Sequence, residues 1–156
     1  MNAPIAGAAS PQEVTSETAR SRTDFKTALF GLAPHEAMVV RALEARRGAA
    51  ESRLQVVFLN ERDEVVKHET QSFAPGKPAK FSVSQAELGT DGDFPAVRAE
   101  MVLTQGSTES EVFLNVEFHS LDKLTIEHGP GCKIPRNTPK SGAIQPLCDG
   151  GLSHSL

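Results

Sequence analysis

Apolar and polar residues alternate with a period of two through most of the middle of the chain. The alternation is clearest in residues 53–60, 95–104 and 111–119. A period of two places every second side chain on the same face of an extended strand. The apolar positions of these stretches are Leu54, Val56, Phe58, Val97, Ala99, Met101, Leu103, Val112, Leu114, Val116 and Phe118. The pattern therefore predicts three strands, each with one face buried in a core.

Turn-forming residues separate these stretches and predict further strands. Residues 60–64 (Asn-Glu-Arg-Asp-Glu) indicate a hairpin loop, and residues 74–78 (Ala-Pro-Gly-Lys-Pro) break the chain before a short strand. Residues 121–127 predict a last strand with Leu124 and Ile126 on one face. Seven or eight short antiparallel strands within roughly one hundred residues are typical of an all-β sandwich.

Residues 34–48 allow two interpretations. A proline near the start and an Arg-Arg-Gly sequence at the end suit a helix. Alternation within residues 37–43 suits a strand instead. Helix propensity slightly favours the first interpretation, whereas agreement with the neighbouring hairpins favours the strand.

The positions of the aromatic residues indicate the extent of the folded body. All eight are Phe, and they lie between positions 25 and 118. Because large rings dominate core burial, we expect the sandwich domain to cover residues 24–128. Residues 1–23 are rich in Ala, Ser, Thr and Pro and are expected to be disordered. Residues 129–156 contain five Gly and four Pro, which predicts an extended C-terminal arm.

Part of the chain resembles bacterial immunoglobulin-like domains. The resemblance rests on two stretches. Residues 55–66 fit two strands joined by an acidic hairpin, and residues 73–83 fit a Pro-Gly turn that leads into another strand. It covers residues 33–119 and implies an immunoglobulin-like antiparallel sandwich with a surface or assembly role. The chain departs from antibody domains because the body lacks the core Trp and the Cys pair, and the resemblance implies no catalytic residues.

Composition and charge narrow the classes of function. The chain has 16 basic and 20 acidic residues, a formal charge of −4, which disfavours nucleic-acid binding. No apolar run is long enough to insert into a membrane. The N-terminus has no basic start followed by an apolar stretch, so we expect no signal peptide and a cytoplasmic protein. The alternative is an extracellular protein or one assembled on a particle surface.

The two cysteines and nearby histidines are the main candidates for site chemistry. Cys132 and Cys148 lie in the predicted arm, where they would form a disulfide or remain free thiols. Together with His128 and His154 they also provide the ligand types of a structural zinc site. No resident cofactor is otherwise indicated.

Other polar residues fit no familiar catalytic pattern. His35-Glu36 begins like a zinc-protease motif, but Val39 stands where the second histidine is required. The carboxylate pairs at residues 63–64 and 91–93 are interpreted as charged turns or, alternatively, as calcium ligands. His119, at the end of a predicted strand, is expected to be solvated.

These observations favour a non-catalytic structural or protein-interaction module rather than an enzyme. The predicted arm carries three large aliphatic residues suited to adding to a sheet edge, Ile134, Ile144 and Leu147. We therefore expect a protein partner, in the simplest case another copy of the chain in a homo-oligomer. The alternative is a small-ligand or metal-binding module that uses the Cys and His residues of the arm.

Overall fold

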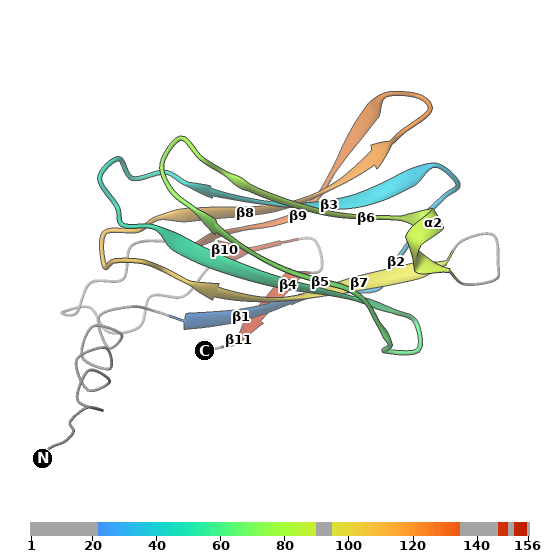
Figure 1. Cartoon of the computed structure of the whole chain (residues 1–156), viewed down its shortest axis with the longest axis horizontal. Coiled ribbons are helices and arrows are strands. Elements are labelled where there is room, and N and C mark those ends of the chain that lie inside the picture. The colour runs from blue at the N-terminus through green and yellow to red at the C-terminus, as the bar shows by residue number, and fades with distance from the viewer. Residues whose placement is uncertain (1–21, 90–94, 135–146, 150–151, 156) are drawn as a thin grey trace, which may run out of the picture.

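The chain folds into two antiparallel β-sheets packed face to face (Figure 1). The computed structural model describes residues 22–89, 95–134, 147–149 and 152–155. One sheet has the strand order β11-β1-β7-β4-β5, with β2 also paired to β7, and the other has the order β10-β9-β8-β3-β6. The strands are β1 (Arg22–Thr27), β2 (Phe30–Gly31), β3 (Glu36–Glu44), β4 (Ser52–Asn60), β5 (Val65–Phe73), β6 (Ala79–Ser84), β7 (Ala96–Thr104), β8 (Val112–Ser120), β9 (Thr125–Ile134), β10 (Leu147–Cys148) and β11 (Leu152–Ser155). The predicted all-β sandwich is thus confirmed.

The core lies between the two sheets and contains the alternating residues that the sequence indicates. On β4, the side chains of Leu54, Val56 and Phe58 are fully buried. The apolar positions of β7 are buried in the same way, as are Val112, Leu114 and Val116 of β8, while Phe118 at the end of β8 is only partly buried. The alternation therefore reports correctly which face of each strand is turned inward, and burial of these faces is the main stabilising contribution.

The segment that allowed two interpretations is a strand. β3 lies in the middle of its sheet and pairs with β6 on one side and β8 on the other. Met38, Val40 and Ala42 point into the core and are fully buried. Pairing on both sides and burial of the inner face outweigh the modest helix propensity of this segment. The helix interpretation is wrong.

A short helix that the sequence did not predict, α2 (Gln85–Leu88), follows β6. It begins with a capping box in which Ser84 and Glu87 bond each other's backbone N–H groups. Gly89 ends the helix in the left-handed conformation, with φ of +59°. Leu88 is buried and anchors this turn against the core.

The boundary expected at residue 128 is wrong, because β9 continues to Ile134 and pairs with β8 along its length. The register shifts between Asn115 and Glu117, so that Gly129 and Pro130 lie together opposite one residue of β8. Proline is tolerated at such bulges and at sheet edges. Gly129 packs tightly against β8, since a Cβ there would lie 2.8 Å from the ring of Phe118. The Gly-Pro-Gly sequence therefore bends a strand here instead of ending it.

The described parts of the predicted arm complete the two sheets of their own chain. β10 pairs with the end of β9, and β11 pairs with β1. Leu152 of β11 is buried in the core cluster. Residues 135–146, and residues 1–21 of the predicted N-terminal tail, lie outside the described residues. The arm is therefore not a separate extended unit where the structure describes it.

The edge of the sandwich formed by β5 and β6 is closed by side chains. The amide of Gln71 on β5 bonds both backbone groups of Lys80 on β6, accepting from its N–H at 3.2 Å and donating to its carbonyl at 2.7 Å. Lys67 donates to the carbonyl of Ser82, two residues further along β6, at 2.8 Å. These bonds occupy backbone groups that an exposed strand edge would offer to another chain.

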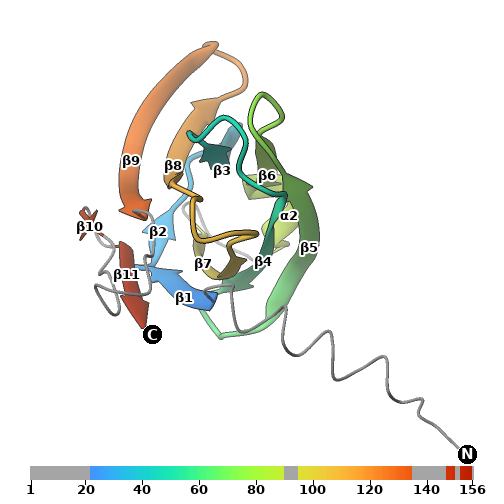
Figure 2. The same ribbon diagram turned by 90° about the vertical axis from the view of Figure 1, so that its left-hand side faces the viewer.

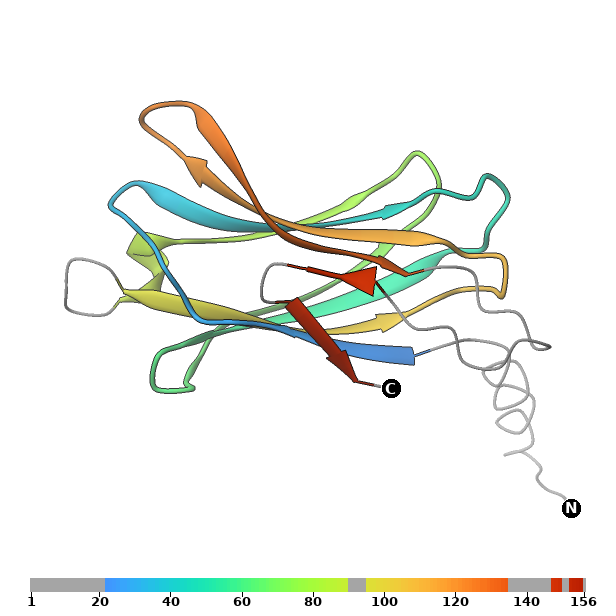
Figure 3. The same cartoon turned by 180° about the vertical axis from the view of Figure 1, so that it is seen from behind.

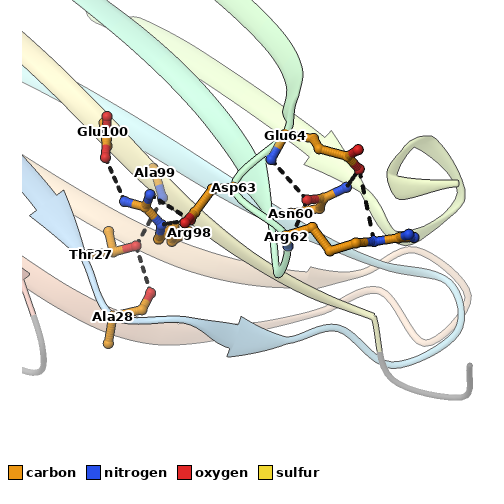
Figure 4. A network of polar contacts seen from close by, with 9 residues as sticks. All are labelled: Thr27, Ala28, Asn60, Arg62, Asp63, Glu64, Arg98, Ala99 and Glu100. Atoms are coloured by element: carbon orange, nitrogen blue, oxygen red, sulfur yellow. Dashed lines mark hydrogen bonds and ion pairs between the residues drawn. The ribbon is translucent and has the colours of Figure 1, made fainter. Parts of the chain in front are cut away.

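Buried polar groups fix the loops at the ends of the strands (Figure 4). In the β4–β5 hairpin, the side-chain oxygen of Asn60 accepts from the N–H groups of Arg62 and Glu64, and its amide donates to the Glu64 carboxylate. Nearby, Arg98 on β7 pairs with Asp63 of the same hairpin at 2.8 Å. Both carboxylates of the pair at residues 63–64 thus have partners within the chain.

Replacing Asn60 by alanine is expected to lower the free energy of unfolding by about 2 kcal/mol, because two N–H groups of the turn lose their acceptor. Asn60 is 5% exposed, so water replaces the lost bonds poorly. The measurement is urea unfolding followed by circular dichroism. Glu61→Ala, an exposed change in the same turn, is the control and should have little effect. Equal midpoints for the two variants would contradict the role of Asn60.

Candidate functional site

The two sheets separate at one end of the molecule, where the hairpin formed by β8 and β9 leans away from the body (Figures 1 and 3). Figure 2 shows the two strands curving outward together, with β2 on their inner side. Sheet pairing places Phe118, Ser120, Thr125 and Glu127 on this inner face. From the opposing sheet, Phe30 of the two-residue strand β2 lines the space below them.

The outer edge of β9 is open along this hairpin. Among the described residues, β9 has a second strand partner only at Cys132 and Lys133, which pair with β10. Asp149 then bonds both backbone groups of Gly131, accepting from its N–H at 2.9 Å and donating to its carbonyl at 3.0 Å. Residues 125–130 follow with no strand on that side in the described chain. Alternate residues of such an edge direct N–H and C=O groups outward.

A groove borders this open edge and consists of two hollows that meet at Phe118 and Glu127. The hollow near Pro130 and Asp149 has a volume of about 600 Å³. The hollow toward the hairpin tip has a volume of about 320 Å³. The rings of Phe30 and Phe118, with centroids 5.2 Å apart, give the groove an apolar wall. We call this feature the edge groove.

The edge groove is acidic. Its lining contains four carboxylates and one lysine, which give a formal charge of −3 when histidine is neutral. The charged residues are Glu36, Asp122, Lys123, Glu127 and Asp149. An extended segment with basic and apolar side chains would complement this surface.

Large aliphatic side chains cluster at the tip of the hairpin. Leu121, Leu124 and Ile126 are 57%, 87% and 53% exposed. The sequence predicted that Leu124 and Ile126 share one face of a strand, but residues 121–124 form the turn and β9 begins at Thr125. Leu124 has φ of +56°, a conformation that non-glycine residues rarely adopt. The turn therefore displays these side chains instead of burying them.

The base of the hairpin is held to the body by backbone bonds. The N–H of Leu121 donates to the carbonyl of His35 at 2.7 Å. Glu36 fixes the turn that carries His35, because its carboxylate accepts from the N–H of Ala33 at 2.8 Å. At the tip, a hydrogen bond from the Ser120 hydroxyl lowers the pKa of Asp122. The groove is thus bounded by a fixed turn on one side and the hairpin on the other.

A charged cluster lies on the opposite, outer face of the hairpin. Glu117 accepts a hydrogen bond from His119 at 2.9 Å, and Arg41 and His128 approach it at 3.2 and 3.9 Å. Burial raises the pKa of the Glu117 carboxyl, but the bond from His119 and the charges of Arg41, His119 and His128 outweigh it, so the net pKa is lowered. His119, expected to be solvated, is instead mostly buried against this carboxylate.

Glu117 is expected to make stability depend on pH on the acid side. Because its pKa is lower in the folded chain than its ordinary value of 4.5, the carboxylate stabilises the fold above that value. This contribution is lost as the pH falls through the folded-state pKa. The measurement is urea unfolding between neutral pH and acid pH for the wild type and for Glu117→Gln. The variant should lose less stability on acidification, and parallel pH profiles would contradict this expectation.

The predicted cysteine and histidine site takes another form. Cys132 and Cys148 are joined by a disulfide between directly opposed positions of β9 and β10. Cys132 is 5% exposed and lies in the core cluster, not in an arm outside the body. Sulfurs in a disulfide cannot act as zinc thiolates. His128 pairs with Glu117, and His154 lies on β11 opposite Phe25, in the other sheet.

The remaining predicted residues have different locations. Ile134 is a buried core residue at the end of β9, and Leu147 begins β10 opposite Lys133. Ile144 and the carboxylates at residues 91–93 lie outside the described residues. In the part of the chain that the structure describes, no group of three or more His, Cys, Asp or Glu side chains is arranged to hold a metal ion.

A further hollow of about 460 Å³ lies on the outer face of the first sheet, over β1, β4 and β7. Val57 and Val102 lie in its lining, together with the cross-strand pair Lys26 and Glu100. Gln55, also in the lining, is bonded to His68 at 3.0 Å. The charged side chains of Lys26 and Glu100 face each other across neighbouring strands, so this hollow is less acidic than the edge groove.

Comparison with known protein families, with curated proteins and with solved structures finds no match for this chain. Within the described residues no helix is long and apolar enough to cross a bilayer, since α2 has four residues.

Proposed function

We propose that the chain is a non-catalytic protein-interaction module whose edge groove accepts an extended segment of a partner protein. The segment would add to the open edge of β9, with main-chain hydrogen bonds providing affinity and the groove selecting side chains. The observation that carries the proposal is the contrast between the two sides of the sandwich. The β6 edge is capped by Gln71 and Lys67, whereas residues 125–130 have no strand partner in the described chain.

Two further features support binding at this place. The rings of Phe30 and Phe118 form an apolar wall beside the open edge, and the exposed aliphatic side chains of the hairpin tip lie at the end of the same hairpin. Asp149 bonds both backbone groups of Gly131, so the free part of the β9 edge starts at the next residue, beside the groove. A strand added there would lie beside the rings of Phe30 and Phe118, and apolar area removed from water would add to the main-chain bonds.

In this proposal, the chain resembles immunoglobulin domains in its arrangement of two packed antiparallel sheets. The pairing of β3 with β6 in one sheet and of β4 with β7 in the other supports it. The pairing of β8 with β3 departs from immunoglobulin domains. In those domains the last two strands, F and G, lie in the same sheet, whereas β7 and β8 lie in different sheets. Many domains with this architecture act as binding scaffolds, which agrees with the proposed function.

The disulfide supports folding in an oxidising compartment, and so favours the extracellular or particle-surface alternative over the cytoplasm. A count of free thiols on protein isolated under non-reducing, alkylating conditions tests this. The expected count is zero. Two alkylated thiols would restore the cytoplasmic assignment.

Selection from a displayed library of random linear peptides tests the proposed function. Wild-type protein should retain peptides that are rich in basic and aliphatic residues. In amide NMR spectra, these peptides should shift the signals of residues 125–129 before those of β5 or β6. Glu127→Lys should weaken their binding, and Glu61→Lys, an equal charge change on an exposed turn, should not. The proposal fails if no peptide is retained, or if every retained peptide shifts amides away from β9.

A further inference from the structure

We infer that the segment received by the edge groove is residues 135–146 of a second copy of this chain. The inference rests on the proposed function and names the partner of the same site. It starts from the charge of the groove, which is −3 with neutral histidine. A complementary segment needs basic residues, no carboxylates and an aliphatic side chain for the Phe-lined wall.

The stretch between β9 and β10 has this composition. It contains Arg136 and Lys140, has no Asp or Glu, and carries Ile144 as its one large aliphatic residue. Residues 1–21 do not match as well, since Glu13 and Glu17 outnumber Arg20 there. Charge complementarity therefore selects residues 135–146 from the parts of the chain that the structure does not describe.

The register of β9 and β10 favours a groove on another molecule. The segment leaves the sheet at Ile134 and returns at Leu147, which lies opposite Lys133. The Cys132–Cys148 pair comes next along β9, then the bonds of Asp149 to Gly131, and only then the groove. Both described ends of the segment, Ile134 and Leu147, are therefore separated from their own groove by this pair and these bonds. A neighbouring molecule can present its groove without this obstacle.

The geometry that follows is head-to-tail. The donor segment follows Ile134, the last residue of β9, whereas the acceptor groove lies toward the opposite end of β9. Because donor and acceptor are different surfaces, each molecule can give and receive at once. Such contacts form closed rings if the rotation between copies closes, and open filaments if it does not.

Light scattering and sedimentation of the full, disulfide-bonded chain test the inference. Wild-type protein should associate as its concentration rises and dissociate at high salt, since the contact is partly electrostatic. The acceptor variant Glu127→Lys and the donor variant Arg136→Glu/Lys140→Glu should each raise the apparent dissociation constant by about tenfold or more. Glu61→Lys and Lys77→Glu provide the same kinds of charge change at exposed turns and should leave association unchanged.

Mixing the acceptor variant with the donor variant shows whether the weaker association comes from a lost direct contact or from the change in net charge. Glu127→Lys keeps the wild-type donor segment and Arg136→Glu/Lys140→Glu keeps the wild-type groove, so one intact contact can form between the two variants. The mixture should therefore associate more strongly than either variant alone. Association that persists in Glu127→Lys places the contact on another surface and overturns the inference. A wild-type chain that stays monomeric at every concentration also overturns it. If library peptides still bind residues 125–129 in that case, the proposed function stands and the partner is a different protein; if none bind, both fail.

Discussion

Replacing Glu44 by alanine is expected to lower the free energy of unfolding by about 3 kcal/mol, since hydrogen bonds to a buried carboxylate are worth more than neutral ones. Glu44 is 3% exposed at the end of β3. Its carboxylate accepts from the Ser110 hydroxyl at 2.6 Å and from the N–H groups of Arg46 and Glu111 at 3.0 and 2.9 Å. Alanine would leave these donors without their acceptor in a place that water reaches poorly.

The bonds of Glu44 join two loops that are far apart in sequence. Ser110 also receives a hydrogen bond from the buried amide of Gln105 at 3.2 Å, so one network fixes both ends of the loop between β7 and β8. Its loss should therefore loosen this end of the sandwich as well as lower global stability. Hydrogen exchange at the amides of Arg46 and Glu111 should accelerate in Glu44→Ala before that of the core strands does.

Two further variants identify the cause of the effect. Glu44→Gln keeps the shape and one acceptor oxygen, and its amide can donate to the Ser110 hydroxyl, so it should lose about 1 kcal/mol. Glu100→Ala removes an exposed carboxylate and should change stability little. If Glu44→Ala unfolds at the same urea concentration as Glu100→Ala, the buried network does not stabilise the fold as the geometry indicates.

The core strands could be predicted because burial leaves a direct trace in the sequence. Where a strand has one face in the core, its apolar side chains recur every second residue, as in β4 and β7. β3 was harder, because its outer face also carries Ala37 and Val39, both buried, and a run of apolar residues does not distinguish a strand from a helix. Its pairing with β6 and β8 decides the matter, and such pairing depends on residues far away in the chain.

The second half of β9 was missed because its residues usually indicate a different structure. Gly129, Pro130 and Gly131 usually indicate a loop, but at an edge strand they allow a bulge and a close approach to β8. Because the predicted domain ended at residue 128, Cys132 was assigned to the arm and its burial in the core was not predicted. The alternation of apolar and polar residues cannot indicate that the strand continues, because the bulge itself interrupts the alternation.

The edge groove could be predicted only in part. Leu121, Leu124 and Ile126 near three charged residues were a signal for a displayed hairpin, yet the same residues also fit a half-buried strand. The groove itself arises because the hairpin extends past the short strand β2 and because Asp149 ends the pairing of β9. Both features depend on how separate parts of the chain meet, which a local pattern does not encode.

Reduction of the Cys132–Cys148 disulfide is expected to lower the free energy of unfolding by about 3 kcal/mol, because the unfolded chain regains the conformational entropy that closure of a loop of this size removes. The bridge joins residues 16 positions apart and ties β10 to the edge of β9. Asp149 follows directly, so the bridge also holds the bonds to Gly131 that mark the end of the open edge. Urea unfolding with and without reductant measures the effect, and Cys132→Ala/Cys148→Ala, which has no bridge, should not respond to reductant.

Local and global effects of reduction should differ. β11 follows the bridge closely and pairs only with β1 among the described strands, so its amides should exchange faster in the reduced chain. The amides of β4 and β7, in the middle of the first sheet, should keep their protection up to the new, lower global stability. Equal unfolding midpoints for the oxidised and reduced chains would mean that the bridge does not hold these strands. If reduction instead unfolds both sheets together without prior release of β11, the C-terminal strands are part of the cooperative core and not a separable edge.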